Sequence, residues 1–123
     1  MKLHLADTKN RYTVTGYGAG YLAVNGVRYA HPLIVTPDQD PAAWLVAEFD
    51  ALDATATGRL LDSRPDIIVL GTGPIQRFAA PAVLRPLIEA GVGLETMNTP
   101  AACRTYNILM GEGRRVLAAM FLP

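Results

Sequence analysis

The sequence predicts an α/β fold in three layers. The first half of the chain contains short β-prone runs separated by Gly, Pro and Asn-Gly, which are turn signals. The second half alternates β-branched apolar runs with helix-like segments, as strands covered by helices do. The 123 residues fit one domain, because single domains cluster near about 100–150 residues. No linker is long enough to separate two domains, so we expect a single domain over residues 1–123.

The strands expected in the first half are short and are bounded by turn residues. Asn25-Gly26 separates the runs 21–24 and 27–29, and the pair predicts a β-hairpin because both turn positions need a positive φ. Glycine at positions 16, 18 and 20 indicates a strand face without side chains, a bulge or a tight bend. Further strands are expected at 12–15, 33–35 and 44–47, the last with a helical turn as its alternative. We expect the hairpins to form or extend a second sheet.

Capping residues mark the helices of the second half. Asp53 is a suitable N-cap for a helix at 54–63. Gly91 is a suitable residue to follow a helix at 79–90, in which Pro86 predicts a kink or a late start. Strands are expected at 67–70, 92–97 and 115–121. The first two should be parallel, because a helix connects them.

A third helix is expected to begin near Thr99 and to end at Gly111. Thr99 is a suitable N-cap, and Pro100 would occupy the first helical position, where its missing N–H costs nothing.

Composition excludes several classes of protein. Lys plus Arg and Asp plus Glu both number 11, so the formal net charge is zero, and half of the residues are hydrophobic. Disordered chains have low hydrophobicity and high net charge. A nucleic-acid partner is not expected, because nucleic-acid binders need a basic excess to displace counterions. The single cysteine, Cys103, precludes an internal disulfide and suits a reducing compartment.

No apolar stretch of the sequence has the length of a signal peptide or a membrane span. We therefore expect a cytoplasmic protein that does not insert into a membrane.

Two segments carry a resemblance to a known family, PDIIVLGTG at 65–73 and GVGLETMNTPAACRTYNIL at 91–109. The matching residues are Pro65, Gly71, Thr72, Gly73, Gly91, Glu95, Met97, Thr99, Ala102, Thr105, Tyr106 and Asn107. Over roughly residues 10–121 the chain resembles a small family of proteins of unknown function, whose eukaryotic branch includes a mitochondrial respiratory complex I assembly factor. The sequence departs from the family at 38–41 and at Gly58, outside these motifs.

The resemblance implies a three-layer fold with a mixed central sheet and a second antiparallel sheet. We expect the helices to lie on one face of the central sheet and the N-terminal hairpins to form the second sheet. The resemblance implies no established enzymatic activity. By analogy with the assembly-factor branch, it makes a role in binding a protein partner plausible.

The first candidate site is Gly71-Thr72-Gly73, which follows the strand at 67–70. Open α/β sheets bind ligands at the carboxyl ends of their strands, so a small anion or a nucleotide is one reading. The alternative is a tight turn that needs a positive φ. The dinucleotide fingerprint fails because Gln76 occupies the position of its third glycine, and no Gly-Lys-Ser/Thr follows as in a P-loop.

The second candidate site is the start of the helix at 99–110, where unpaired amides and Arg104 provide positive charge. If the strands at 67–70 and 92–97 are adjacent, Gly73 and Thr99 border one crevice. The alternative is ordinary helix capping with structural hydrogen bonds. The residues expected at a ligand or partner crevice are Gly71, Thr72, Gly73, Glu95, Met97, Asn98, Thr99, Arg104 and Thr105.

No catalytic residue, metal site or cofactor is predicted. A helix N-terminus could activate the Cys103 thiol, but His4 and His31, the candidate bases, lie in the β-rich half, so burial as a small hydrophobe is favoured. Two histidines and one cysteine at this spacing make no zinc site, and Asp38 and Asp40 fit a turn.

The sequence therefore favours a non-catalytic binding or assembly module that contacts a protein partner. The first alternative is an enzyme or sensor for a small anionic ligand bound between Gly71–Gly73 and Thr99–Thr105. The second is a self-associating structural protein, because a net charge of zero gives little repulsion between copies.

Overall fold

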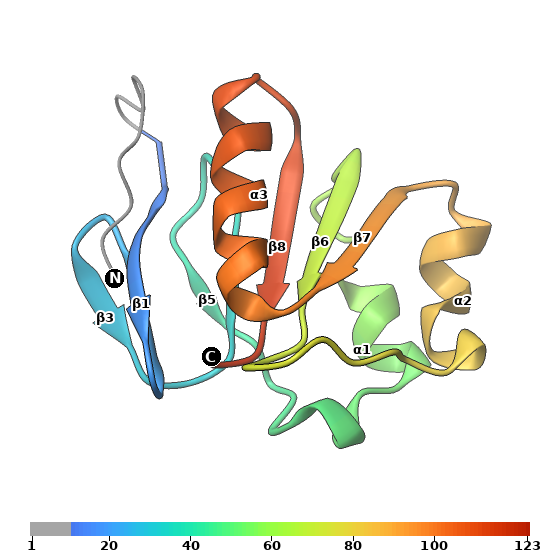
Figure 1. Cartoon of the computed structure of the whole chain (residues 1–123). Helices are drawn as coiled ribbons and strands as arrows, with labels where there is room; N and C mark the ends of the chain where they lie inside the picture. Colours follow the sequence, from blue (N-terminus) through green and yellow to red (C-terminus); the bar gives the residue numbers. More distant parts are fainter. Residues whose placement is uncertain (1–10) are drawn as a thin grey trace.

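The computed structural model describes residues 11–123, so His4 and the N-terminal segment considered above lie outside the described residues. At its centre is a five-stranded mixed sheet of order β5-β4-β8-β6-β7 (Figure 1). Its strands are β4 (Leu33–Val35), β5 (Ala42–Ala43), β6 (Ile67–Gly71), β7 (Gly93–Met97) and β8 (Val116–Met120). Strand β6 is parallel to both β7 and β8, whereas β4 is antiparallel to β8 and β5.

A second, antiparallel sheet has the order β1-β2-β3. Its strands are β1 (Val14–Gly18), β2 (Tyr21–Val24) and β3 (Val27–Tyr29). Asn25 and Gly26 have φ values of 48° and 81°, which confirms the predicted hairpin. The register between β1 and β2 shifts between Val14 and Gly16, so the glycine-rich segment contains the irregularity that its composition indicated.

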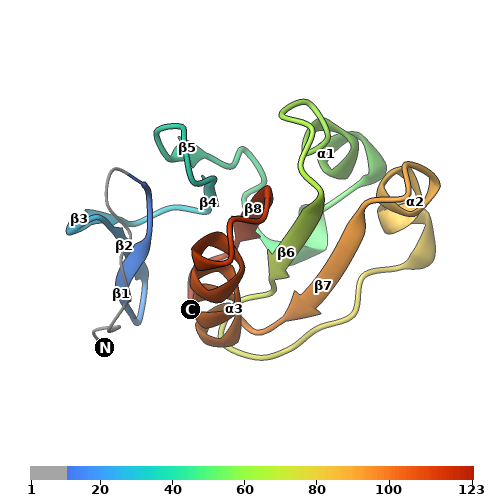
Figure 2. The ribbon, with the colours of Figure 1, turned by 90° about the horizontal axis from the view of Figure 1, so that it is seen from above.

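The helices cover both faces of the central sheet. They are α1 (Ala54–Arg59), α2 (Pro81–Glu89) and α3 (Thr99–Gly111), and a short 3₁₀ helix, η1 (Phe49–Ala51), precedes α1. Helix α3 and the three-stranded sheet lie on one face of the central sheet, and α1 and α2 lie on the opposite face (Figure 2). The predicted three-layer α/β class with two sheets is confirmed.

The expectation that the helices share one face is wrong in this detail, and the reason lies in β6. Ile67 and Val69 point to the side of α3, whereas Ile68 and Leu70 point to the side of α1 and α2. A strand that is apolar on both faces needs cover on both.

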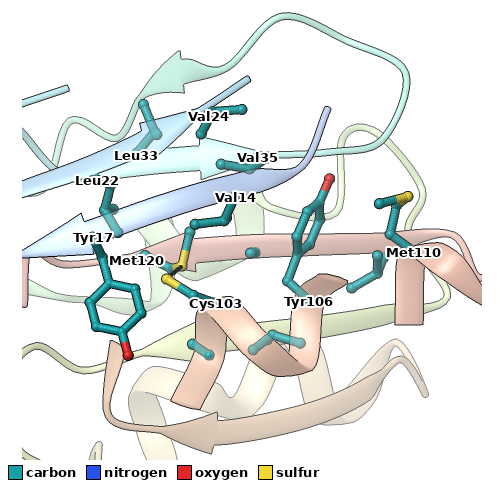
Figure 3. Packing of buried hydrophobic residues seen from close by; sticks show 14 of the residues in the cluster. Val14, Tyr17, Leu22, Val24, Leu33, Val35, Cys103, Tyr106, Met110 and Met120 are labelled. Atoms are coloured by element: carbon teal, nitrogen blue, oxygen red, sulfur yellow. Dashed lines mark hydrogen bonds between the residues drawn. The ribbon is translucent and has the colours of Figure 1, made fainter. Parts of the chain in front are cut away.

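The core on the α3 side is shared by the two sheets. Tyr106, Cys103 and Met110 of α3 pack against β1 and β2 on one side and against β6 and β8 on the other (Figure 3). The core on the other side joins α1 and α2 to the sheet through Leu60, Leu87 and Ile68.

The segment 44–47 is not a strand, contrary to expectation; the edge strand at this place is the shorter β5. Trp44 and Val46 are buried and Leu45 is 89% exposed, so the side chains alternate as in a strand although the segment pairs with no strand. Trp44 instead donates its backbone N–H to the carbonyl of Pro32 at 2.9 Å and packs its ring 4.6 Å from that of Phe121.

The helix boundaries follow the predicted caps in part. Asp53 caps α1 by accepting from the Ala56 N–H at 2.8 Å, as expected, although α1 ends at Arg59. Helix α2 starts late, at Pro81, and keeps Pro86 in its interior. Gly91 follows it with a φ of 71°.

Within residues 11–123, no helix has the length and hydropathy needed to span a bilayer.

Candidate functional site

The carboxyl end of β6 and the start of α3 meet directly. The Thr99 hydroxyl accepts from the Gly73 N–H at 2.8 Å and donates to the Phe121 carbonyl at 2.7 Å. The Thr99 N–H in turn donates to the Gly73 carbonyl at 2.8 Å. Because Thr99 is fully buried, its side chain fills the space that was expected to be a crevice between these two segments.

Gly71 explains how closely α3 approaches β6. A Cβ atom at this position would lie 2.9 Å from both the Thr99 hydroxyl and Met120 Cγ, and 3.2 Å from the Ala102 Cβ. Gly73 has a φ of 105°, which is the turn conformation given as the alternative for this motif. The glycines therefore have structural roles at the junction.

Thr72, between the two glycines, shapes the loop that follows β6. Its N–H donates to the Met97 carbonyl at 2.9 Å, which extends the pairing with β7. Its hydroxyl donates to the Ile75 carbonyl at 2.7 Å and accepts from the Arg77 N–H at 3.1 Å. One buried side chain thus fixes the conformation of residues 72–77.

The N-cap of α3 is Asn98, which corrects the expectation for Thr99. Asn98 is extended, with φ −62° and ψ 158°, and its Oδ1 accepts from the Ala101 N–H at 2.8 Å. Thr99 belongs to the helix, and its hydroxyl is engaged across the junction with β6.

The remaining predicted residues lie on the same side of the sheet but do not converge on Gly73. Arg104 donates to the Tyr17 hydroxyl at 3.1 Å, and the Thr105 hydroxyl lies 3.2 Å from Met97 Sδ. Glu95 is exposed on the edge strand β7, and no ion pair joins it to Arg104 in the part of the chain that the structure describes.

A cavity of about 470 Å³ opens beside the junction, between the loop after β6 and the end of β8. Thr72 and Gly73 line it. The other lining residues, which sequence reasoning did not single out, are Pro32, Ala47, Glu48, Phe49, Pro74, Ile75, Arg77, Phe121 and Leu122. Pro74, Ile75 and Arg77 directly follow the glycine motif, whereas the other residues come from distant segments that no local pattern connects.

Arg77 ties the loop to η1 at this cavity. Its guanidinium lies 2.5 Å from Asp50 Oδ1 and 4.4 Å from the centre of the Phe49 ring. The Phe49 ring in turn packs edge-on against that of Phe121, with 6.0 Å between the ring centres and an angle of 68° between the ring planes.

Two large apolar side chains are exposed on this same loop. Ile75 is 65% exposed and Phe78 is 84% exposed. The available signal was the run Pro-Ile-Gln-Arg-Phe at 74–78, which places two large apolar residues between the expected strand and the expected helix.

Cys103 is buried in the core and does not face this site. Its Sγ lies 3.9 Å from Met120 Sδ (Figure 3). Burial raises the pKa of the Cys103 thiol to about 12, which outweighs the lowering effect of the nearby Arg104. Among residues 11–123, no group of three His, Cys, Asp or Glu side chains is placed to hold a metal ion.

The comparison with known families follows this geometry. The model of the family described as "Protein of unknown function (DUF498/DUF598)" matches residues 14–121, which include every described strand and helix. The chain belongs to this family. The DUF498 match includes both segments of the junction, Gly71–Gly73 and the start of α3.

Several relatives are similar to this chain over most of its length. The NADH dehydrogenase (ubiquinone) 1 alpha subcomplex assembly factor 3 of Bos taurus is 32% identical over 112 residues, which is 89% of this chain and 60% of that protein. An uncharacterized protein of Rhodobacter capsulatus is 33% identical over 107 residues, 87% of this chain and 82% of that protein. The chain therefore spans about 60% of the length of the assembly factor that it matches.

Solved structures of similar chains share the DUF498 fold described here. A crystal structure of a Bordetella parapertussis protein is 40% identical, with a TM-score of 0.86, and covers 95% of this chain and 100% of its own. A solution structure from Bordetella pertussis, called a Mth938-like domain, is 37% identical with a TM-score of 0.78, and covers 98% of this chain and 92% of its own.

Proposed function

We propose that this chain is a non-catalytic protein-binding module that assists the assembly of a multi-subunit complex. The observation that carries the proposal is the loop after β6, which presents Ile75 and Phe78 to solvent beside the cavity of about 470 Å³. Exposed apolar side chains that gather at a cavity are typical of protein-interaction sites.

Hydrogen bonds and one ion pair hold residues 72–77 of the loop in place. The Thr72 hydroxyl contacts the backbone of Ile75 and Arg77, the Arg77 guanidinium pairs with Asp50, and Gln76 Nε2 lies 3.4 Å from the Thr96 carbonyl on β7. A preorganised apolar anchor loses little conformational entropy on binding, so its contacts contribute more to affinity.

The relatives support the assembly role. Assembly factor 3 of NADH dehydrogenase is named for such a role, and it is related over most of this chain. We propose that the partner is a protein with an apolar segment that covers Ile75 and Phe78, and that it is not a nucleic acid. Thr72 and Gly73 would form the inner wall of this surface. Contact of Glu95, Asn98, Arg104 and Thr105 with a partner stays a prediction.

The alternative of an enzyme or sensor for a small anion between Gly73 and Thr99 draws no support. The Thr99 side chain occupies that space, and its hydroxyl already bridges the Gly73 N–H and the Phe121 carbonyl.

The experiment compares two matched double variants as bait in native lysate. Ile75→Ser with Phe78→Ser removes the apolar loop anchor. Ile88→Ser with Ile108→Ser removes two other exposed apolar side chains, each 62% exposed, from α2 and α3. Mass spectrometry of the retained proteins should find subunits of one complex with the native chain and the helix variant, and lose them with the loop variant. Equal retention by both variants, or recovery of the bait alone, would contradict the proposal.

We also place the chain in the cytoplasm as part of this proposal, because its one cysteine is a buried free thiol suited to a reducing compartment. Fractionation of cells that produce the tagged chain tests this location.

Light scattering on the purified chain distinguishes binding of a different protein from self-association, because only self-association raises the mass of the purified chain.

A further inference from the structure

A second cavity, of about 340 Å³, lies at the opposite end of the central sheet, where β6 and β8 begin. Figure 2 looks onto this end of the molecule. The cavity is formed by the turn from α3 to β8, the loop after β4 and the segment before β6. Its lining residues are Arg11, Thr36, Pro37, Asp38, Gln39, Ser63, Pro65, Gly113, Arg114, Arg115 and Val116.

The charge of this lining is strongly unbalanced for a chain of zero net charge. Arg11, Arg114 and Arg115 contribute three guanidinium groups, and Asp38 is the one acid among the lining residues. Asp38 is a weak counter-ion, because its side chain is 82% exposed and its Oδ1 lies 3.8 Å from Arg11 Nε. Among residues 11–123, no ion pair engages Arg114 or Arg115.

The walls of the cavity are fixed by backbone and side-chain hydrogen bonds. Arg11 Nη1 donates to the Met110 carbonyl at 3.0 Å, so this guanidinium is anchored at the end of α3. The Arg114 N–H donates to the Leu109 carbonyl at 3.1 Å, and the Tyr12 N–H donates to the Pro37 carbonyl at 2.9 Å. The three arginines therefore stand on segments that are held in place.

We propose that this cavity binds a small soluble ligand through a phosphate or pyrophosphate group. The guanidinium group offers a planar fork of donors that matches phosphate oxygens, and it stays charged at all physiological pH values. The volume lies near the lower bound of about 300 Å³ for ligand pockets, so it suits a compact anion. Thr36 and Ser63 bring hydroxyl groups to the same lining.

This site is separate from the surface proposed for a protein partner. The two cavities share no lining residue, and they lie at opposite ends of β6. Failure of either proposal therefore leaves the other intact.

Calorimetric titration with pyrophosphate and with inorganic phosphate, at an ionic strength of about 0.15 M to screen loose surface attraction, tests the proposal. Arg114→Gln with Arg115→Gln should weaken pyrophosphate binding at least about tenfold, because two charge-assisted contacts are lost. Asp38→Asn should strengthen binding, since it removes the one acid of the lining. Arg59→Gln with Arg85→Gln, on α1 and α2, is the matched control of equal charge and should leave binding unchanged.

The opposite signs expected for the arginine and aspartate variants guard against misfolding as an explanation, and melting temperatures of all variants give a further check. Sedimentation with vesicles of phosphatidylglycerol separates a soluble phosphate ligand from a lipid headgroup. The proposal is overturned by absence of heat with both anions, by equal weakening in the control variant, or by binding to vesicles without binding to pyrophosphate.

Discussion

The side-chain amide of Asn107 makes hydrogen bonds to both backbone groups of Val14. Its Oδ1 accepts from the Val14 N–H at 3.0 Å, and its Nδ2 donates to the Val14 carbonyl at 2.9 Å. Val14 lies at the outer edge of the three-stranded sheet, so Asn107 provides there what a neighbouring strand would provide. This contact joins residues 93 positions apart and fastens β1 to α3.

Replacement of Asn107 by leucine should destabilise the fold strongly. The side chain is only 5% exposed, and its loss leaves two backbone groups of Val14 buried without partners. We expect a loss of about 2–4 kcal/mol in the free energy of unfolding, measured by urea denaturation. Ile108→Ala, at the next and exposed position, should change it by less than about 0.5 kcal/mol. Similar values for the two variants would show that the Asn107 contact contributes little.

Thr99 allows a test of the junction between β6 and α3 that separates its hydroxyl from its shape. Thr99→Val keeps the shape but removes the partner of the Gly73 N–H and the Phe121 carbonyl. We expect it to cost about 2–5 kcal/mol by thermal or urea unfolding, because two buried groups lose their hydrogen bonds. Thr99→Ser keeps the hydroxyl and should cost about 1 kcal/mol for the lost methyl group. A larger loss for serine than for valine would count against the hydrogen bonds.

Gly71 and Gly111 should respond to alanine with opposite signs. At Gly71 the new methyl group would press on the Thr99 hydroxyl, which two hydrogen bonds hold in place, so we expect a loss of about 1–3 kcal/mol. Gly111, the last residue of α3, has open space around it, and alanine there should stabilise the chain by up to about 1 kcal/mol. The unfolding midpoint of Gly71→Ala should lie below that of the native chain and the midpoint of Gly111→Ala above it. Shifts of the same sign in both variants would contradict the prediction.

Stability should decline at alkaline pH because of Cys103. Burial raises the pKa of its thiol from an ordinary value of 9.0 to about 12, so above pH 9 the unfolded chain releases this proton while the folded chain retains it. The free energy of unfolding should therefore be level below about pH 9 and fall by about 1.4 kcal/mol per pH unit as the pH rises toward 12.

Cys103→Ala isolates this contribution. Burial also raises the pKa of Tyr106, but its ordinary value is 10.0, so it contributes only above that pH. Between pH 9 and 10 the alanine variant should show a shallower decline than the native chain when both are unfolded in urea. Parallel curves over this interval would exclude Cys103 as the cause.

Local sequence signals predicted most of the fold because turns and covered strands depend mainly on the residues within them. Asn25-Gly26 forms its hairpin wherever the flanking runs can pair, and the apolar run at 67–70 had to be a covered strand. The run at 44–47 was wrongly predicted as a strand, because its side chains alternate as they do in a strand. Its alternating side chains pack on Phe121 and on α1. The Trp44 N–H continues the β5–β4 pairing at Pro32, but residues 44–47 do not form a strand, which local sequence does not reveal.

The candidate site was predictable only in part. The meeting of Gly73 with Thr99 followed from the parallel strands, but the sequence does not say which of two adjacent polar residues, Asn98 or Thr99, caps the helix. Nor does it say that Thr99 fills the crevice. The neighbouring cavity depends on Phe49, Arg77 and Phe121, whose contacts arise from tertiary packing alone.

The rate at which a reagent modifies the buried thiol of Cys103 measures how often the layers of the fold separate. The thiol lies where α3 meets β8 and the three-stranded sheet, so a reagent reaches it only when these layers separate. When reclosing is fast, the rate of thiol modification reports the equilibrium between closed and open forms. Equal opening free energies from this rate and from complete unfolding would mean that the two sheets open together. A smaller value from the modification rate would mean that the three-stranded sheet parts from α3 while the central sheet stays folded.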